Sequence, residues 1–248
     1  MTLLPPLPVY RTDLFRPQYR PFQSSRWRLH IAGMVLCPGY WSPPQLVTDM
    51  AALMRIENGV ARTWMSMTPL EIESQELGCR HATGHVVVMG LGMGWAAANA
   101  ALNPAVTRVT VVEFDPEIIE AVRCSAVIEQ LPPEASSKIT VLLGDAYEFV
   151  PEIPADTLMA DIWLPLFGAE RDQELRRMHA NTGGAKVYFW GQEMVIADRA
   201  RQAGLALTAE TVGRIIADMA LPLIGPAECP DYPDLISRVA AKWLKPRA

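Results

Sequence analysis

The feature that most constrains the fold is a series of apolar segments that alternate with helical segments from residue 85 onward. Five apolar segments read as strands, at 86–90, 109–113, 139–143, 157–164 and 185–190. Helical stretches begin near Gly94, Pro116, Ala146, Glu170 and Gln192. Apolar strands separated by helices are typical of a parallel sheet with crossover helices. We therefore predict an α/β domain with helices on both faces of the sheet.

Two later stretches extend the predicted sheet. Residues 206–212 and 215–223 read as strands that finish it as an antiparallel hairpin. The sequence thus predicts a mostly parallel sheet of seven strands.

The segment before this domain predicts a small extension. Asn58-Gly59 lies between two short apolar runs, which is the strongest short signal for a β-hairpin. Thr68-Pro69 and the acid Glu71 predict a helix start, and we expect that helix to run to about Cys79. We expect residues 1–83 to form an arm, this hairpin and a covering helix. Residues 84–248 then form the main domain.

Three alternate glycines follow the first predicted strand directly. Gly90, Gly92 and Gly94 let the backbone turn tightly and approach a ligand, and the next helix offers free N–H groups at its N-terminus. A dinucleotide fingerprint needs glycine or alanine at the sixth position counted from Gly90, where this chain has Trp95. The bulky indole argues against NAD and favours a cofactor without a pyrophosphate, such as S-adenosylmethionine.

Acids follow the next two predicted strands. Glu113 ends the second strand, at about 20 residues past the glycine loop, where an acid accepts hydrogen bonds from ribose hydroxyls. Asp145 follows the third strand, at the carboxyl edge of the sheet where ligands bind, and we expect it to hold the adenine amino group. The adjoining Leu91, Phe114 and Ala146 complete the expected cofactor contacts.

Several stretches match a known family. They are NPAVTRVTVVEFDPEIIEAV at 103–122, ITVLLGDAYEFV at 139–150, the hairpin RIENGVARTW and the acid-bearing helix TPLEIESQ. From about Arg55 to Trp190 the chain resembles the spermidine synthase-like branch of the class I S-adenosylmethionine-dependent methyltransferases. The resemblance implies a Rossmann-like methyltransferase fold, S-adenosylmethionine as cofactor and a possible homodimer. It also implies that Gln75 contacts the cofactor and that Glu73 and Trp64 contact substrate.

Two residues near the end of the fourth predicted strand are candidates for the chemistry. Asp161 is placed to act as a general base or substrate anchor, and its alternative role is a sheet-edge carboxylate paired with backbone N–H groups. Trp163 is placed to wall the substrate pocket, and its alternative role is core packing.

The scarcity of acidic residues after the fourth predicted strand favours methyl transfer over aminopropyl transfer. Aminopropyltransferases carry a second Asp-rich segment after the fourth strand, whereas Asp161 stands here among apolar residues. We therefore expect a methyltransferase that acts on a small-molecule acceptor. Two alternatives stay open: an aminopropyltransferase that uses decarboxylated S-adenosylmethionine, and a non-catalytic binding module with a degenerate pocket. An NAD-dependent oxidoreductase ranks below both.

Composition excludes other classes. The net charge of -5 gives no electrostatic case for a nucleic-acid partner. The 4 cysteines and 4 histidines show no metal-ligand spacing, so we expect no metal. No signal peptide and no apolar run long enough for a membrane span are present, which predicts a cytoplasmic protein without a membrane partner. Residues 1–45, rich in proline and arginine, read as a partly ordered surface arm, and the alternative is an arm that covers an active site or reaches a partner subunit.

Overall fold

The computed structural model describes residues 7–168 and 171–244. A four-stranded antiparallel sheet comes first, with strand order β1-β2-β3-β4. Its strands are β1 (Phe22–Gln23), β2 (Trp27–Cys37), β3 (Gln45–Glu57) and β4 (Val60–Ser66). β3 and β4 form the predicted hairpin, which turns at Asn58 and Gly59 with φ of 52° and 77°. The Asn-Gly prediction is confirmed.

The N-terminal sheet includes part of the predicted surface arm. β2 pairs with β3 from Trp27 opposite Arg55 to Cys37 opposite Gln45. Trp27 and Leu29 are buried, because alternate residues of a strand point to the same face. Residues 22–37 are therefore a structural part of the fold, which corrects the prediction of a surface tail for this stretch.

The main sheet has five parallel strands in the order β7-β6-β5-β8-β9. They are β5 (Gly84–Met89), β6 (Val106–Glu113), β7 (Ile139–Leu143), β8 (Thr157–Ala160) and β9 (Lys186–Phe189). The chain runs outward from β5 through β6 to β7 and then continues on the other side of β5 with β8. Ligands of open α/β sheets bind at the carboxyl ends of the strands beside such a reversal.

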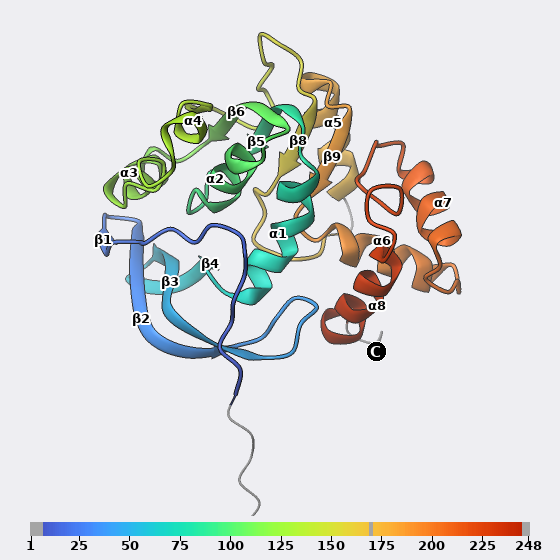
Figure 1. Cartoon of the computed structure of the whole chain (residues 1–248), viewed down its shortest axis with the longest axis horizontal. Helices are drawn as coiled ribbons and strands as arrows, with labels where there is room; N and C mark the ends of the chain where they lie inside the picture. Colours follow the sequence, from blue (N-terminus) through green and yellow to red (C-terminus); the bar gives the residue numbers. More distant parts are fainter. Residues whose placement is uncertain (1–6, 169–170, 245–248) are drawn as a thin grey trace, which may run out of the picture.

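Helices cover both faces of this sheet (Figure 1). They are α1 (Pro69–His81), α2 (Trp95–Leu102), α3 (Pro116–Cys124), α4 (Pro133–Ser136), α5 (Arg171–Thr182), α6 (Gln192–Gln202), α7 (Ala209–Met219) and α8 (Tyr232–Trp243). Val86 and Val88 of β5 pack in one core with α2 and the N-terminal sheet. Val87 and Met89 pack in a second core with β9, α6 and α7. Burial on both faces explains why β5 reads as a continuous apolar run.

The prediction that two strands, at 206–212 and 215–223, finish the main sheet is wrong. Residues 209–219 form α7, and the sheet gains there a single bridge between Val187 and Leu223 in place of two strands. The buried residues Val212, Ile215 and Met219 have the spacing of one helix face, and the Thr208 side chain accepts a hydrogen bond from the N–H of Thr211 as an N-cap. The main sheet therefore has five strands in the described residues and not seven.

The helix expected near Ala146 is a single turn at 146–148, so residues 144–156 connect β7 to β8 without a helix.

None of the helices in the two described stretches has the length and apolar character needed to span a membrane.

Candidate functional site

A cavity of about 470 Å³ lies where the carboxyl ends of β5, β6 and β8 face α1 and the N-terminal sheet. Its volume falls within the range of about 300–1,000 Å³ that is typical of small-molecule sites. Eleven of the residues predicted from the sequence line it: Trp64, Gln75, Gly90, Leu91, Gly92, Glu113, Phe114, Asp145, Ala146, Asp161 and Trp163. The topology therefore brings together residues that are spread over about 100 positions of the sequence.

Two predicted contact residues do not line this cavity. Gly94 is the N-cap of α2, and a Cβ there would lie 3.1 Å from Val122 in the core. Glu73 is buried and accepts hydrogen bonds from the N–H groups of Trp41 (2.9 Å) and Ser42 (3.1 Å). Residues two apart on a helix point in different directions, so Glu73 faces away from Gln75. The structure gives both residues supporting roles instead of the predicted contacts.

The glycine loop passes tightly between neighbouring strands. Gly90 has φ of 96°, and a Cβ there would lie 2.2 Å from the carbonyl oxygen of Asp161. Gly92 has φ of 51°, and a Cβ there would lie 2.6 Å from the sulfur of Met65 on β4. Gly90 is required for the close approach of this loop to the backbone that follows β8, whereas at Gly92 glycine is favoured by the positive φ and Met65 can move aside.

We expect Gly90→Ala to lower the free energy of unfolding by at least about 1–3 kcal/mol, the scale of a strained backbone position. The clash with Asp161 adds to that cost. Gly204→Ala is the matched control, because Gly204 also has a positive φ of 65° but has nothing within 4 Å of an added Cβ. Urea unfolding of the two variants separates the cost of the clash from the cost of the backbone strain. Equal losses of unfolding free energy in Gly90→Ala and Gly204→Ala would show that the backbone around Gly90 moves to accommodate the added Cβ.

Glu113 ties the glycine loop to the end of β6. Its carboxylate accepts hydrogen bonds from the N–H of Leu91 (2.8 Å) and from the N–H of Asp115 (2.8 Å). Asp145 stands at the end of β7, is exposed and accepts a hydrogen bond from the N–H of Tyr147 (2.8 Å). Two acids thus stand on neighbouring strand ends beside the glycine loop, with carboxylate oxygens available for ligand hydroxyl or amino groups.

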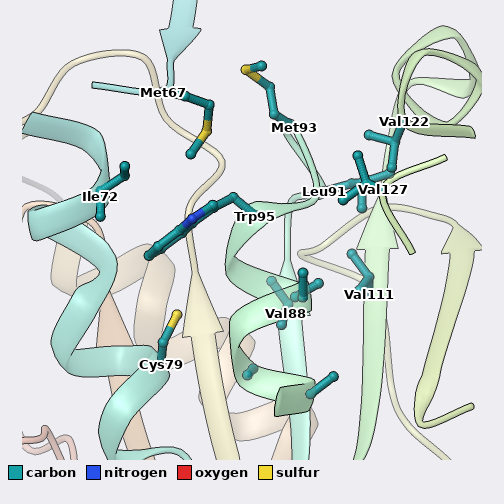
Figure 2. Packing of buried hydrophobic residues seen from close by; sticks show 14 of the residues in the cluster. Met67, Ile72, Cys79, Val88, Leu91, Met93, Trp95, Val111, Val122 and Val127 are labelled. Carbon is teal, nitrogen blue, oxygen red and sulfur yellow. The ribbon is translucent and has the colours of Figure 1, made fainter. Parts of the chain in front are cut away.

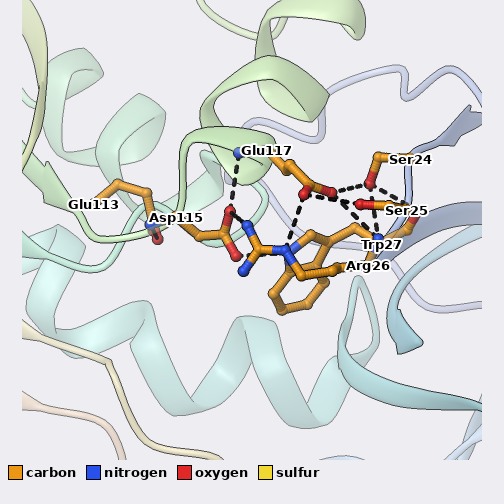
Figure 3. Close-up of polar contacts among 7 residues, drawn as sticks. All are labelled: Ser24, Ser25, Arg26, Trp27, Glu113, Asp115 and Glu117. Carbon is orange, nitrogen blue, oxygen red and sulfur yellow. Dashed lines mark hydrogen bonds and ion pairs between the residues drawn. The ribbon is translucent and has the colours of Figure 1, made fainter. Parts of the chain in front are cut away.

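The N-terminal sheet is fastened over this edge by polar contacts (Figure 3). The indole N–H of Trp27 and the guanidinium of Arg26 donate to the two oxygens of Asp115, both at 2.9 Å. Arg26 also donates to Glu117 at 2.9 Å, and the hydroxyls of Ser24 and Ser25 donate to the same carboxylate. These hydrogen bonds hold the pKa of Glu117 near 2. The contacts place Trp27 on the cavity wall.

This wall corrects the favoured prediction of a surface tail for residues 1–45 and agrees with the alternative, in which the arm covers the candidate site. Trp27 and Trp64 meet edge to face at 5.5 Å, and the Arg55 guanidinium lies 5.4 Å from the ring centre of Trp64. All three line the cavity. The alternation of apolar residues in 27–29 is the signal that could have indicated a strand here.

Asp161 lines the cavity beside α1. The amide of Gln75 donates to its Oδ2 at 2.6 Å. Glu71, one helical turn before Gln75 on the same helix face, lines the cavity as well and is 6% exposed. Burial raises the pKa of Asp161 to about 7, against the lowering effects of Gln75 and Arg171. Burial and the negative charge of Asp161 raise the pKa of Glu71 well above its ordinary value. The sequence analysis did not select Glu71 as a contact residue.

Aromatic side chains enclose the carboxyl groups. The guanidinium of the buried Arg171 lies 4.1 Å from the ring centre of Trp163 and donates to the carbonyl oxygens of Trp190 and Pro165. Trp163 thus lies on the cavity wall, packed against a cation.

Trp95 fills the space behind the glycine loop. Its indole packs among Met67, Ile72 and Cys79 (Figure 2) and is 3% exposed. Its Nε1 has no hydrogen-bond partner in the described part of the chain. A buried indole at the start of α2 occupies the position where a dinucleotide site needs a small residue.

No cluster of three or more histidine, cysteine, aspartate or glutamate side chains suited to a metal ion occurs in the described residues.

No protein-family model matches this sequence, and no curated protein matches it significantly. Among solved structures, the methyltransferase domain of bacterial CtHen1 matches with a TM-score of 0.37 and 15% identity, over 48% of this chain and 65% of that chain. The glycopeptide N-methyltransferase MtfA in complex with S-adenosylmethionine matches with a TM-score of 0.35 and 19% identity, over 45% of this chain and 50% of that chain. The precorrin 8w decarboxylase of Methanobacterium thermoautotrophicum matches with a TM-score of 0.38 and 20% identity, over 55% of this chain and 73% of that chain.

The first two of these alignments span less than two thirds of the matched structures, and all three TM-scores lie below 0.5. The architecture therefore rests on the strand order and register of this chain itself.

Proposed function

We propose that this protein is an S-adenosylmethionine-dependent methyltransferase that acts on a small-molecule acceptor. The observation that carries the proposal is the arrangement of Gly90, Gly92, Glu113 and Asp145 around one cavity, on the ends of three neighbouring parallel strands. Trp95 supports a nucleoside-like cofactor without a pyrophosphate.

The chain's residues fit such a cofactor in three respects. Gly90 and Gly92 line the cavity without side chains, so the backbone of the loop faces the ligand space directly. Glu113 is placed to accept hydrogen bonds from ribose hydroxyls, and the exposed Asp145 to accept them from the adenine amino group. Phe114 lies 76% exposed on the cavity wall between these acids, where an apolar ring can cover the base.

The proposed chemistry asks little of the protein beyond alignment and water exclusion. A bound S-adenosylmethionine would supply an electrophilic methyl group for displacement by the acceptor atom. Asp161 takes up the proton that the acceptor atom loses, and Gln75 holds the carboxylate in place through the 2.6 Å hydrogen bond. Trp64 and Trp163 wall the acceptor space against water.

We expect Glu113→Ala to weaken the binding of S-adenosylmethionine by about 1–3 kcal/mol, the scale of lost charge-assisted hydrogen bonds. Isothermal titration measures the change. Glu120→Ala is the matched control, because Glu120 lies outside the cavity on α3 and pairs with Arg123. Unchanged affinity in Glu113→Ala would remove Glu113 from the proposed ribose site.

The cytoplasmic location, the homodimer and the division at residue 83 remain proposals. Light scattering of the purified chain tests the homodimer directly.

A further inference from the structure

The carboxyl pair of Glu71 and Asp161 has a charge that the described residues do not balance. The Glu71 side chain is 6% exposed, and its carboxylate makes no hydrogen bond and no ion pair within residues 7–168 and 171–244. A buried carboxylate without a partner is costly, so such a group normally meets a proton or a ligand. Both carboxyl groups line the same cavity.

The positive charges nearby do not supply the missing partner. Arg171 acts on Asp161 from α5, but its two Nη atoms donate to the backbone oxygens of Trp190 and Pro165. It therefore offsets at most one of the two negative charges. At the rim, Arg26 is paired with Asp115 and Glu117, and Arg55 is paired with Glu57. The cavity thus holds one negative charge in excess at its deep end when both carboxyl groups are ionised.

Two kinds of group can balance that charge, a shared proton or a cationic ligand. The site is open to a ligand, because both carboxyl groups line the cavity. A cation with N–H donors can offset the charge and donate hydrogen bonds to the carboxylate oxygens. Gln75 already donates to Asp161, which leaves the Glu71 carboxylate and one oxygen of Asp161 free to accept N–H donors.

We propose that the Glu71–Asp161 pair is a binding site for a cationic alkyl nitrogen, which replaces a proton that the pair holds when no ligand is present. The inference rests on the proposed function and deepens it. The ammonium group has two sources: the amino-acid end of the cofactor, or an acceptor that is itself an amine.

The first test is titration calorimetry at pH 6.5 in phosphate and in imidazole buffer, whose different ionisation enthalpies report the protons released on binding. S-adenosylhomocysteine carries an ammonium group, and methylthioadenosine lacks it. Release of protons with the first ligand and not with the second assigns the site to the cofactor.

The second test uses the protein saturated with S-adenosylhomocysteine. Butylamine and benzylamine are titrated against butanol and benzyl alcohol, which match their shapes without a charge. Proton release and preferred binding of the amines assign the site to the acceptor. Equal binding of amines and alcohols, together with no proton release by any adenosyl ligand, would overturn the proposal.

Glu71→Gln gives the matching variant. It is expected to weaken the binding of the ammonium-bearing ligand about 10- to 100-fold, the effect of losing a charge-assisted hydrogen bond, and to reduce the proton release to the part that Asp161 supplies. The affinity for methylthioadenosine stays within twofold. Glu76→Gln is the control on the same helix, because Glu76 pairs with Arg80 outside this cavity. Proton release by Glu71→Gln equal to that of the unmodified protein contradicts the assignment.

The proposed function and this inference fail separately. If no adenosyl ligand binds, the methyltransferase proposal falls, and the same amine and alcohol titrations into the ligand-free protein still decide whether the pair binds a cation.

Discussion

Asp161→Asn is expected to lower the turnover of methyl transfer about 10²- to 10⁴-fold, the usual contribution of a positioned general base. Asparagine keeps the shape of the side chain but cannot take up the proton of the acceptor. The affinity for S-adenosylmethionine should stay nearly unchanged if the Glu71–Asp161 pair binds the acceptor, and should fall if the pair binds the amino group of the cofactor. The measurement is the release of S-adenosylhomocysteine with an acceptor identified by screening amines, hydroxyls and thiols.

The dependence of turnover on pH tests whether Asp161 acts as the base. The base acts as a carboxylate, and burial raises the pKa of Asp161 to about 7, so turnover of the unmodified protein rises as the pH increases through about 7. The turnover of Asp161→Asn should not show this rise with pH. Asp234→Asn, on the exposed face of α8, serves as the matched control. Equal turnover in Asp161→Asn and the unmodified protein would exclude the proposed role.

A stability measurement tests the same buried carboxyl group without an acceptor. The pKa of Asp161 is raised from its ordinary value of 3.8 to about 7 in the folded state, so the folded protein binds more protons than the unfolded chain between these two pH values. The free energy of unfolding of the unmodified protein therefore falls as the pH rises from about 4 to about 7. The free energy of unfolding of Asp161→Asn should therefore depend less on pH in this window.

Glu193→Ala is expected to lower the free energy of unfolding by about 3–5 kcal/mol, through unsatisfied hydroxyls and a cavity. Its fully buried carboxylate accepts hydrogen bonds from the hydroxyls of Tyr40, Tyr188 and Tyr232, each at 3.0 Å. Tyr188 keeps its bond to the carbonyl oxygen of Ser74, whereas the hydroxyls of Tyr40 and Tyr232 lose their acceptor. The cluster joins the N-terminal segment, β9, α6 and α8, so the loss should appear as one cooperative shift.

Urea unfolding measures the change, with Glu210→Ala on the exposed face of α7 as the control. Glu210→Ala should stay within about 0.5 kcal/mol of the unmodified protein. A loss below about 1 kcal/mol in Glu193→Ala would mean that water or a neighbouring side chain satisfies the tyrosines.

The strands of the main sheet could be predicted from the sequence because each is a short apolar run. β5, β8 and β9 are largely buried, whereas the edge strand β7 is apolar but has no buried residue. The predicted span 139–143 coincides with β7, and 86–90 and 185–190 lie within one or two residues of β5 and β9. Such apolar runs, separated by helical stretches, determine the order of the elements. Asn58-Gly59 and Thr68-Pro69 placed the hairpin and α1 correctly, because their local backbone chemistry leaves few alternatives.

The errors occurred where short apolar runs fit two periods. Residues 209–219 contain Val212, Ile215 and Ile216, which read as strand residues, yet their burial follows the helix period. β2 was missed although residues 27–31 alternate between apolar and polar types, because the proline and arginine content of residues 1–45 favoured a surface arm. Only the partner strand β3 shows which face of β2 is buried.

The candidate site was predictable where motif and strand end coincide, as at Gly90, Glu113 and Asp161. Glu71 and Glu73 could not be ranked by the same means, because both are acids on one helix and the direction of each depends on how α1 packs. The structure turns Glu71 toward the cavity and Glu73 toward the backbone of 41–42.

The cavity between the glycine loop and Glu113 is expected to bind S-adenosylmethionine. The most direct test is parallel isothermal titration of the purified protein with S-adenosylmethionine, S-adenosylhomocysteine, decarboxylated S-adenosylmethionine and NAD. We predict that the first two bind and that NAD does not. Preference for the decarboxylated form would favour aminopropyl transfer, and binding of NAD alone, or of none of the four, would contradict the claim.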